Sequence, residues 1–340
     1  MIIEALRKLI NKENLSKTEI KEVMSEITEG TATDAQIASF LTALRMKGET
    51  VDEITASVEF LKEKGEKLNL KNRDVIDIVG TGGDGSNTFN ISTAVSFVVA
   101  AGGVRVAKHG SRASSSKSGA ADILEVLGAN IYLDAKQNEE LLDKTNICFM
   151  FAPKFNPLMK SVYNVRREIK IRTVFNCLGP LINPSCAKTQ MIGVYGKNLV
   201  EPVSLVMKNL NVQNGIVLFG ECGLDEASVV SKTFYSRIVD NEIKTGEFSP
   251  ADFGIKEAKI EDIKGGTPIE NAEIMKGIFK GKIKGAKLDV VCLNAALAFL
   301  SAKKTDTVEK GLELSYSLIE SGSVYKKLIQ FIEGTNEYTR

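Results

Sequence analysis

The fold of this chain is decided by one stretch, Val75-Ile76-Asp77-Ile78-Val79 followed by Gly80-Thr81-Gly82-Gly83-Asp84-Gly85. The first five residues form a mostly β-branched run, which is typical of a buried strand. The six that follow satisfy the pattern G-x-G-x-x-G, in which glycines let backbone amides approach an anion closely. A strand that ends in such a turn predicts an α/β domain with an anion site at the end of the strand.

Outward from this turn, short apolar runs alternate with helical patterns. Alternating strands and helices favour an α/β domain with a mainly parallel central sheet flanked by helices. The predicted strands are 75–79, 104–107, 148–151 and 215–220, and the predicted helices are 94–101, 118–128, 157–167, 271–279, 289–301 and 308–319.

The first seventy residues are predicted to form consecutive helices. Capping boxes begin at Ser16, Thr33 and Thr50, where a hydroxyl and a Glu or Gln three residues later satisfy each other's backbone amides. Gly30 and Gly48 end the helices between them, because glycine adopts the left-handed conformation without strain. The chain is therefore expected to have a small all-helical domain and a larger α/β domain.

We expect the helical domain to span residues 1–68 and the α/β domain 69–340. A helical unit this small buries little surface by itself, so it should pack against the larger domain and against a second subunit.

Composition restricts the possible functions. The net charge is +1, so no extended field would attract nucleic acid or a membrane surface, and attraction for anions must be local. The N-terminus lacks the pattern of a signal peptide, and no apolar stretch is long enough to cross a bilayer. Five dispersed cysteines are typical of reduced thiols in the cytoplasm. Because His109 is the only histidine, histidine-rich metal sites and serine–histidine triads elsewhere are excluded.

The residues around the glycine turn favour phosphate over a dinucleotide. A dinucleotide fold places an acidic residue at the end of the second strand, whereas this chain has Lys108-His109-Gly110 there. The polar string of residues 86–93 lies at a predicted helix N-terminus, where free amides favour an anion. A second loop, residues 108–119, carries three cationic side chains and several hydroxyls; a solvated linker is the alternative interpretation.

Two further elements carry candidate binding residues. Asp225 and Glu226 are adjacent in a predicted loop and could coordinate Mg²⁺, which keeps waters and bridges to substrate phosphates. Arg166 and Arg167 could hold a carboxylate. Taken alone, each pair is also typical of a solvated surface.

These four elements, in this order, resemble the anthranilate phosphoribosyltransferase family over nearly the whole chain. The most specific part is Gly80-Thr81-Gly82-Gly83-Asp84-Gly85 with Thr88-Phe89-Asn90-Ile91-Ser92-Thr93. The resemblance continues through residues 40–48, 172–184 and 294–296.

The resemblance implies an enzyme that moves the phosphoribosyl group of 5-phosphoribosyl 1-pyrophosphate to the amine of anthranilate, releasing pyrophosphate, in tryptophan biosynthesis. It also implies two Mg²⁺ ions per active site and a cytoplasmic homodimer joined through the helical domain, which part of residues 165–190 would complete. An aryl amine is a sufficient nucleophile, so the family needs little general-base catalysis, and no acid or base is assigned here.

Carried over by position, the family's phosphoribosyl pyrophosphate contacts fall on two segments and its metal ligands on a third. The first segment contributes Gly80, Gly83, Asp84, Thr88, Asn90, Ile91, Ser92 and Thr93, and the second contributes Lys108, His109, Gly110, Ser111, Arg112, Ala113, Ser114, Ser115 and Ser116. The metal ligands would be Ser92, Asp225 and Glu226, and the anthranilate contacts would be Gly80, Ser111 and Arg166.

Four positions depart from the family pattern. The family usually has Asn at Ser111, Ser at Ala120, and a pair of histidines at Phe155 and Asn156. Three of these changes fall on the acceptor side. A related phosphoribosyltransferase or nucleoside phosphorylase with another aromatic acceptor or base therefore stays open as an alternative. A non-catalytic relative that binds nucleic acid is disfavoured by the neutral charge and the acidic pair.

Overall fold

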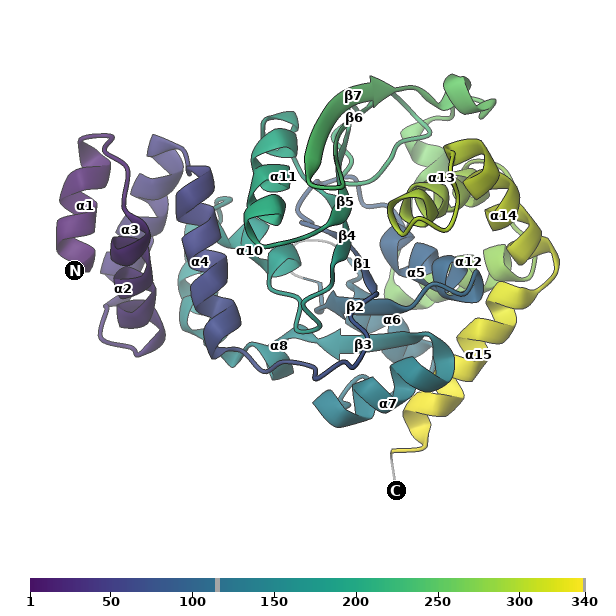
Figure 1. Cartoon of the computed structure of the whole chain (residues 1–340), viewed down its shortest axis with the longest axis horizontal. Coiled ribbons are helices and arrows are strands. Elements are labelled where there is room, and N and C mark those ends of the chain that lie inside the picture. The colour runs from purple at the N-terminus through teal and green to yellow at the C-terminus, as the bar shows by residue number, and fades with distance from the viewer. Residues whose placement is uncertain (114–116, 339–340) are drawn as a thin grey trace.

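A computed structural model describes residues 1–113 and 117–338 of the chain. Figure 1 shows a group of N-terminal helices at one end of the molecule and a twisted sheet with helices on both faces at the other. The predicted combination of a helical unit and an α/β unit with a mainly parallel sheet is confirmed. In the described part of the chain, no helix is both long enough and apolar enough to cross a bilayer.

The N-terminal helices are α1 (Ile2–Ile10), α2 (Lys17–Thr28), α3 (Asp34–Lys47) and α4 (Val51–Lys64). All three predicted capping boxes are present, at Ser16, Thr33 and Thr50. Gly48 ends α3 with φ of 90°, and Gly30 follows α2 with φ of 75°. Local hydrogen bonding therefore sets the helix boundaries, as the sequence predicted.

Seven strands form one sheet in the order β3-β2-β1-β4-β5-β6-β7. The first five in this order are parallel, and β6 and β7 add an antiparallel hairpin at one edge. The strands are β1 (Ile76–Gly80), β2 (Val106–Gly110), β3 (Ile147–Phe151), β4 (Thr189–Gly193), β5 (Asn214–Gly220), β6 (Thr233–Val239) and β7 (Glu242–Phe248).

Helices cover both faces of this sheet (Figure 1). On one face, α5 and α13 pack together and contact β1, β4 and β5. On the other face, α11 packs between the sheet and the N-terminal helices, because it contacts β5 and β6 on one side and α4 on the other. The helices after β1 are α5 (Ile91–Ala101), α6 (Ala120–Val126), α7 (Ala135–Thr145), α8 (Ala152–Phe155), α9 (Tyr163–Ile169), α10 (Phe175–Leu181), α11 (Val200–Asn209), α12 (Pro268–Phe279), α13 (Ala286–Ser301), α14 (Val308–Glu320) and α15 (Ser323–Asn336). Short 3₁₀ turns lie at Pro157–Val162, Lys197–Leu199, Pro250–Phe253 and Ile260–Ile263.

Two predicted boundaries were wrong in ways that matter for the site. The second strand was predicted at 104–107 but runs over Val106–Gly110, because parallel pairing with Ile147–Phe151 continues past the apolar residues. Lys108 and His109 are therefore strand residues, not loop residues. The helix predicted at 157–167 is a 3₁₀ turn followed by α9. Strands β4, β6 and β7 were not predicted.

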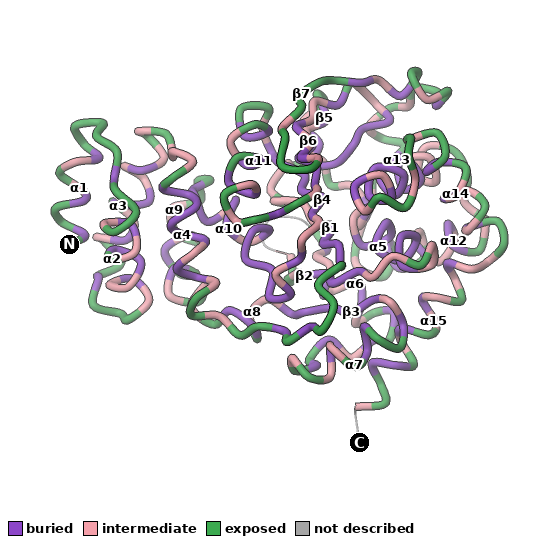
Figure 2. Tube along the Cα trace, viewed as in Figure 1, coloured by how far each residue is buried: buried purple, intermediate pink, exposed green. Residues whose placement is uncertain are grey.

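The buried residues, purple in Figure 2, form two apolar clusters. One cluster contains the α5 and α13 residues, and the other joins the N-terminal helices to the α11 face. Helices α9 and α10 contact α3 and α4. Part of the middle of the chain thus packs against the N-terminal helices, while the domain division at residue 68 stays a prediction.

Candidate active site

The candidate site lies where β1 and β4 end. Gly80 and Gly193 are paired residues at the carboxyl ends of these neighbouring parallel strands. The chain leaves β1 toward β2 on one side, and it returns from β3 to β4 on the other side. This reversal is a topological switch point, where open α/β sheets bind ligands in the crevice beyond the strand ends.

Asp225, which follows β5, packs against both of these glycines. Its Oδ2 accepts a hydrogen bond of 2.7 Å from the backbone N–H of Gly82. A Cβ on Gly80 would lie 2.3 Å from the same Oδ2, and a Cβ on Gly193 would lie 1.5 Å from the Asp225 carbonyl oxygen. Only glycine allows this approach, so the two strand ends and the acidic loop are fitted to one another.

Three carboxyl groups converge here without a matching set of cations. Burial, and after it repulsion from the neighbouring Asp84, raises the pKa of Asp225 to about 7. Burial also raises the pKa of Glu226 well above its ordinary value, followed by repulsion from Asp225, while Lys108 opposes the shift. Asp84 Oδ2 is buried and has no hydrogen-bond partner within the described residues. The cluster holds more negative charge than its surroundings neutralise.

This charge imbalance fits a bound Mg²⁺. Carboxylate and hydroxyl oxygens are the donors that Mg²⁺ prefers, and it usually takes only one or two carboxylates and completes its shell with water and substrate phosphate. No group of three or more His, Cys, Asp or Glu side chains among residues 1–113 and 117–338 is arranged to hold a metal by itself. Asp225, Glu226 and Ser92 offer donors of this kind, which suit an ion shared with a phosphorylated substrate.

Lys108 lies beneath the carboxylates. The strand buries its side chain, and its Nζ donates to the carbonyl oxygen of Ile78 at 2.6 Å and to Ser92 Oγ at 3.3 Å. Burial lowers the pKa of Lys108, and Asp77 and Glu226 oppose that shift. Ser92 lies in the first turn of α5, so Lys108 links this predicted metal ligand to the backbone of β1.

The polar string after the glycine turn leads into α5 as predicted. Asn90 is the N-cap of α5, and Ile91 and Thr93 are buried in its first turn. Thr88 makes an isolated antiparallel bridge with Lys264. The contacts expected of Gly83, Asp84, Thr88 and Asn90 to Thr93 thus lie on one continuous segment beside Asp225.

The second predicted loop is divided between core and surface. His109 is buried in β2, and burial lowers its pKa to about 4 despite an opposing hydrogen bond with the Gly179 backbone. A Cβ on Gly110 would touch the Phe149 ring at 3.0 Å, so this strand end is also tightly packed. Ser111 is exposed, and Ala113 is half-buried. The predicted residues Ser114, Ser115 and Ser116 lie outside the described residues.

Arg112 is directed toward α6. Its guanidinium contacts Asp122 at 3.1 Å, Glu125 at 2.9 Å and the hydroxyl of Tyr132 at 2.9 Å. These bonds compete with a substrate for the same donors, so the expected phosphoribosyl pyrophosphate contact of Arg112 would require them to open.

Arg166 is the cation predicted for the acceptor side. It is half-buried on α9, burial lowers its pKa, and its Cζ lies 5.9 Å from the centre of the Phe175 ring. In the described part of the chain it forms no ion pair. A partly desolvated guanidinium without a carboxylate is suited to take one from a ligand.

The other departures from the family pattern occupy structural positions here. Phe155 is fully buried in the α/β core, and its carbonyl oxygen accepts from the backbone N–H of Glu66 at 2.9 Å. Asn156 is buried and donates to the carbonyl oxygen of Leu61 at 3.4 Å. Both therefore hold the connection that leaves α4. Ala120 begins α6, beside Gly110.

Three supporting residues were not predicted as parts of the site. Arg172 donates to the carbonyl oxygen of Gly83 and stacks 4.4 Å from the centre of the Tyr195 ring. Asn294 accepts from the backbone N–H of Ala227 and donates to its carbonyl oxygen, both at 2.9 Å, directly after the acidic pair. Asn271 contacts Asn90. Arg172 and Asn294 lie in stretches covered by the family resemblance, which was the available signal, but their contacts could not be predicted because each acts on a segment distant in sequence.

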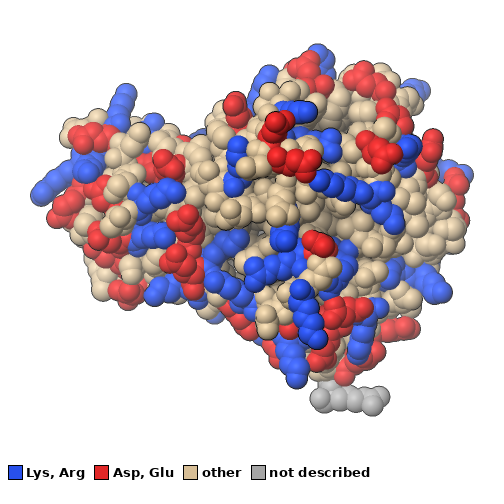
Figure 3. Space-filling model, in the orientation of Figure 1, with Lys and Arg blue, Asp and Glu red and all other residues tan. Residues whose placement is uncertain are grey.

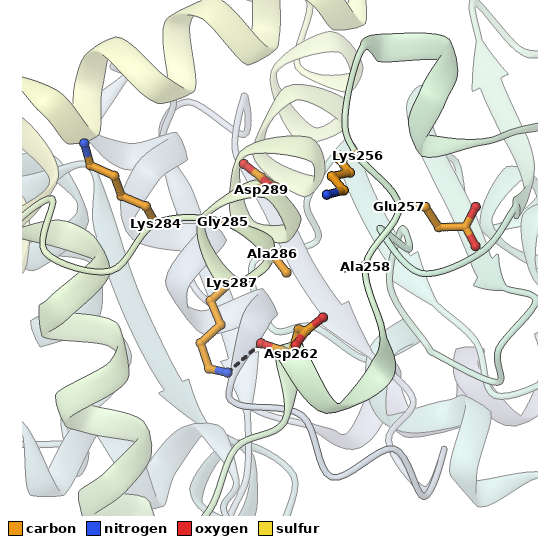
Figure 4. Close-up of a pocket in the computed structure, with 9 residues that line it drawn as sticks. All are labelled: Lys256, Glu257, Ala258, Asp262, Lys284, Gly285, Ala286, Lys287 and Asp289. Carbon is orange, nitrogen blue, oxygen red and sulfur yellow. Dashed lines mark hydrogen bonds between the residues drawn. The ribbon is translucent and has the colours of Figure 1, made fainter.

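A separate cavity of about 460 Å³ lies beside the N-terminus of α13 (Figure 4). Within it, Lys287 donates to the carbonyl oxygen of Asp262 at 2.6 Å. Its lining contains none of the predicted site residues, so this cavity and the candidate site are distinct. The lining residues are Lys256, Glu257, Ala258, Asp262, Lys284, Gly285, Ala286, Lys287 and Asp289.

Basic side chains gather on the face that Figure 3 presents, around the hollow between the N-terminal helices and the α/β part. Because the net charge is only +1, this concentration of Lys and Arg is local. A local basic patch attracts an anionic small molecule without making the whole protein a nucleic-acid binder.

Comparison with known protein families gives the class of protein to which this fold and site belong. Residues 3–65 match the helical bundle domain of a glycosyl transferase family, and residues 72–325 match the a/b domain of that family. The chain is 47% identical over 336 residues to the anthranilate phosphoribosyltransferase of Methanobrevibacter smithii, covering 99% of this chain and all of the relative. This chain belongs to the anthranilate phosphoribosyltransferase family.

Solved structures give the same result. The anthranilate phosphoribosyltransferase of Thermus thermophilus superposes with a TM-score of 0.91 at 36% identity, covering 98% of this chain and 99% of that one. The Saccharomyces cerevisiae enzyme in complex with PRPP and Mg has a TM-score of 0.91 at 29% identity, covering 99% and 98%. Its complex with 4-fluoroanthranilate has a TM-score of 0.88 at 27% identity, with the same coverage.

Proposed function

We propose that this chain is an anthranilate phosphoribosyltransferase, which transfers the phosphoribosyl group of 5-phosphoribosyl 1-pyrophosphate to the amine of anthranilate and releases pyrophosphate. The observation that carries the proposal is the contact between Asp225 and the Gly80–Gly85 turn at the switch point of the sheet. It places a cluster of buried carboxyl groups directly beside a glycine turn whose backbone can approach an anion closely. That combination suits a phosphorylated substrate bound together with Mg²⁺.

Binding of the donor is assigned to two segments. The residues from Gly80 to Thr93 would surround the phosphoribosyl pyrophosphate with amides and hydroxyls, and the segment from Lys108 to Ser116 would supply further contacts. Bond cleavage leaves negative charge on pyrophosphate while positive charge grows on the ribose ring. The main task of the site is therefore to orient the donor and the acceptor and to stabilise that charge.

Mg²⁺ would be held by Ser92, Asp225 and Glu226, with two ions per active site as the proposed number. When bound, it supplies charge neutralisation for the leaving pyrophosphate. Support comes from the raised pKa values of Asp225 and Glu226. Burial and then repulsion between carboxylates raise them, and a nearby cation would stabilise the charged forms.

On the acceptor side, Arg166 would bind the anthranilate carboxylate, with Gly80 and Ser111 as further contacts. The amine attacks without a strong base, so the buried, neutral His109 is given no proton-transfer role. A second candidate, a related phosphoribosyltransferase or nucleoside phosphorylase with another aromatic acceptor or base, is favoured by Ser111, which replaces the amide usual in the family.

We also propose a cytoplasmic homodimer that associates through a helical domain of residues 1–68 and part of 165–190. Exposed apolar side chains on α1 and α3 support this assignment, since Ile10 is 74% exposed and Met46 is 81% exposed. Light scattering at working concentration should give the mass of two chains, and a monomer would remove the dimer from the proposal.

One assay tests the function. Purified protein is mixed with anthranilate, phosphoribosyl pyrophosphate and Mg²⁺, and the loss of anthranilate fluorescence is followed. Turnover that needs all three components supports the proposal. No turnover by folded protein that still binds phosphoribosyl pyrophosphate would favour the second candidate, and other aromatic amines and bases would then be tried with the same donor.

A further inference from the structure

Asn271 joins α12 to the start of α5 across 181 positions of sequence. Its side chain is 1% exposed. Its Nδ2 donates to Asn90 Oδ1 at 3.0 Å, and its Oδ1 accepts from the backbone N–H of Gly266 at 2.7 Å. The amide of Asn271 is thus fixed by one bond in each direction.

Asn90 is also bonded to the end of the second loop. Ser118 Oγ donates to Asn90 Oδ1 at 3.1 Å, and Asn90 Nδ2 donates to the Ser118 carbonyl oxygen at 3.1 Å. Asn90 therefore connects the segment after the glycine turn with the segment that follows Ser116. Asn271 is the third member of this cluster, and it approaches from a different element.

The hydrogen bonds that Asn90 already makes determine which atom of its side-chain amide can still bond to a ligand. A side-chain amide has two acceptor lone pairs and two N–H donors. Both lone pairs of Asn90 Oδ1 are used, by Ser118 and Asn271, whereas Nδ2 gives only one of its hydrogens to a residue in the described ranges. The remaining group is an N–H, which suits a phosphate or hydroxyl oxygen.

The element that carries Asn271 is held against the same segment by its backbone. Gly265 donates to the carbonyl oxygen of Asn87 at 2.9 Å, and Lys264 bridges Thr88. A Cβ on Gly265 would lie 2.6 Å from the backbone nitrogen of Phe89. Asn271 is therefore placed by close backbone packing and not by a flexible loop.

We propose that Asn271 is a positioning residue for the phosphoribosyl pyrophosphate site. It holds the amide of Asn90 in the orientation that presents N–H to the donor substrate, and it couples the two donor-binding segments. This inference rests on the proposed function. It assigns Asn271 no contact with substrate.

The sharpest variant is Asn271→Asp, which has almost the same shape. The carboxylate can still accept from Gly266, but it cannot donate to Asn90, and it places an acceptor against an acceptor. The matched control is Asn138→Asp. Asn138 lies on α7 and is also fully buried. Its Nδ2 donates to the carbonyl oxygens of Leu133 and Asp134 at 3.2 and 2.9 Å.

We expect Asn271→Asp to raise the KM for phosphoribosyl pyrophosphate about ten-fold. That is the effect of losing one well-placed hydrogen bond from Asn90 to the charged substrate. The KM for anthranilate should change less than about two-fold. Asn138→Asp should lose comparable thermal stability with both KM values unchanged. If Asn271→Asp does not fold, Asn271→Ala removes the same bond without adding a charge.

A double-mutant cycle separates positioning from general damage. In an Asn90→Ala background, Asn271→Asp should add less than about two-fold to the KM for phosphoribosyl pyrophosphate, because its effect passes through Asn90. Independent, multiplicative effects would overturn the inference, as would an Asn271→Asp protein that behaves like the control. An inactive wild type would instead count against the proposed function and remove the inference with it.

Discussion

Asp225 Oδ2 accepts a hydrogen bond from the backbone N–H of Gly82 at 2.7 Å, joining two segments 143 residues apart. The bond brings the acidic loop after β5 onto the glycine turn after β1. It also partly offsets the burial of Asp225, whose pKa is nevertheless raised to about 7. The turn proposed to bind the phosphorylated substrate and the carboxylates proposed to hold Mg²⁺ are therefore positioned by the same contact.

Replacing both acidic residues, Asp225→Asn with Glu226→Gln, should lower kcat/KM by a factor on the order of 100 and weaken its dependence on Mg²⁺. The side chains keep their shape, so the protein should remain folded. The control is Asp289→Asn, a partly buried carboxyl group in the separate cavity, which should leave kinetics unchanged. Unchanged Mg²⁺ dependence in the double variant would contradict a metal role for the pair.

Asp225 should also make stability depend on pH in the absence of Mg²⁺. Its pKa is raised from 3.8 to about 7, so between these values the folded state binds the proton more tightly than the unfolded state does. The free energy of unfolding should therefore fall as the pH rises through that window. The difference in Tm between Asp225→Asn and wild type should grow from pH 4 to pH 8. A constant difference would mean that Asp225 is not perturbed.

Arg166→Ala should raise the KM for anthranilate by a factor on the order of 10 to 100 and leave the KM for phosphoribosyl pyrophosphate within about two-fold. The reason is that a partly desolvated guanidinium forms strong bonds to a carboxylate. Its neighbour Arg167 is exposed on the same helix, so Arg167→Ala is the control. Equal changes in both KM values would show that Arg166 does not act on the acceptor.

Gly193→Ala should damage the site through the backbone. The added Cβ would lie 1.5 Å from the Asp225 carbonyl oxygen, so the acidic loop must move. We expect a loss of stability on the order of 3 kcal/mol and a large loss of activity. Gly179→Ala is the control, because a Cβ there meets nothing within 4 Å. Denaturant unfolding would measure the loss of stability in both variants, and steady-state kinetics would measure their activity. A fully active Gly193→Ala enzyme would disprove the requirement for a close approach at this position.

Much of the local structure could be predicted from the sequence because its causes are local. The capping boxes at Ser16, Thr33 and Thr50 need only residues three positions apart, and all are present. The strand before Gly80 was evident from its β-branched residues. By contrast, β4 was missed because its partner β1 is distant in sequence. The β6–β7 hairpin was missed although its two strands are adjacent in sequence, because their residues are not uniformly apolar.

Parallel pairing also moved the boundary of β2, which placed Lys108 and His109 in the core. Polar residues such as Lys108 and His109 at the end of an apolar run are typical of a loop, so the sequence predicted one there. The neighbouring β3 continues the ladder to Gly110 and buries them. Their buried positions, and the lowered pKa of His109, are consequences of tertiary packing.

The sequence by itself determined the α/β architecture, the glycine turn from Gly80 to Gly85 and the residue types available for phosphate and Mg²⁺. Only the tertiary structure decided which of them meet. Asp225 reaches Gly82 because the strand order reverses between β1 and β4, and Asn271 reaches Asn90 because the segment before α12 packs against the residues that precede α5. Such contacts join positions more than 140 residues apart, and short-range patterns carry no information about them.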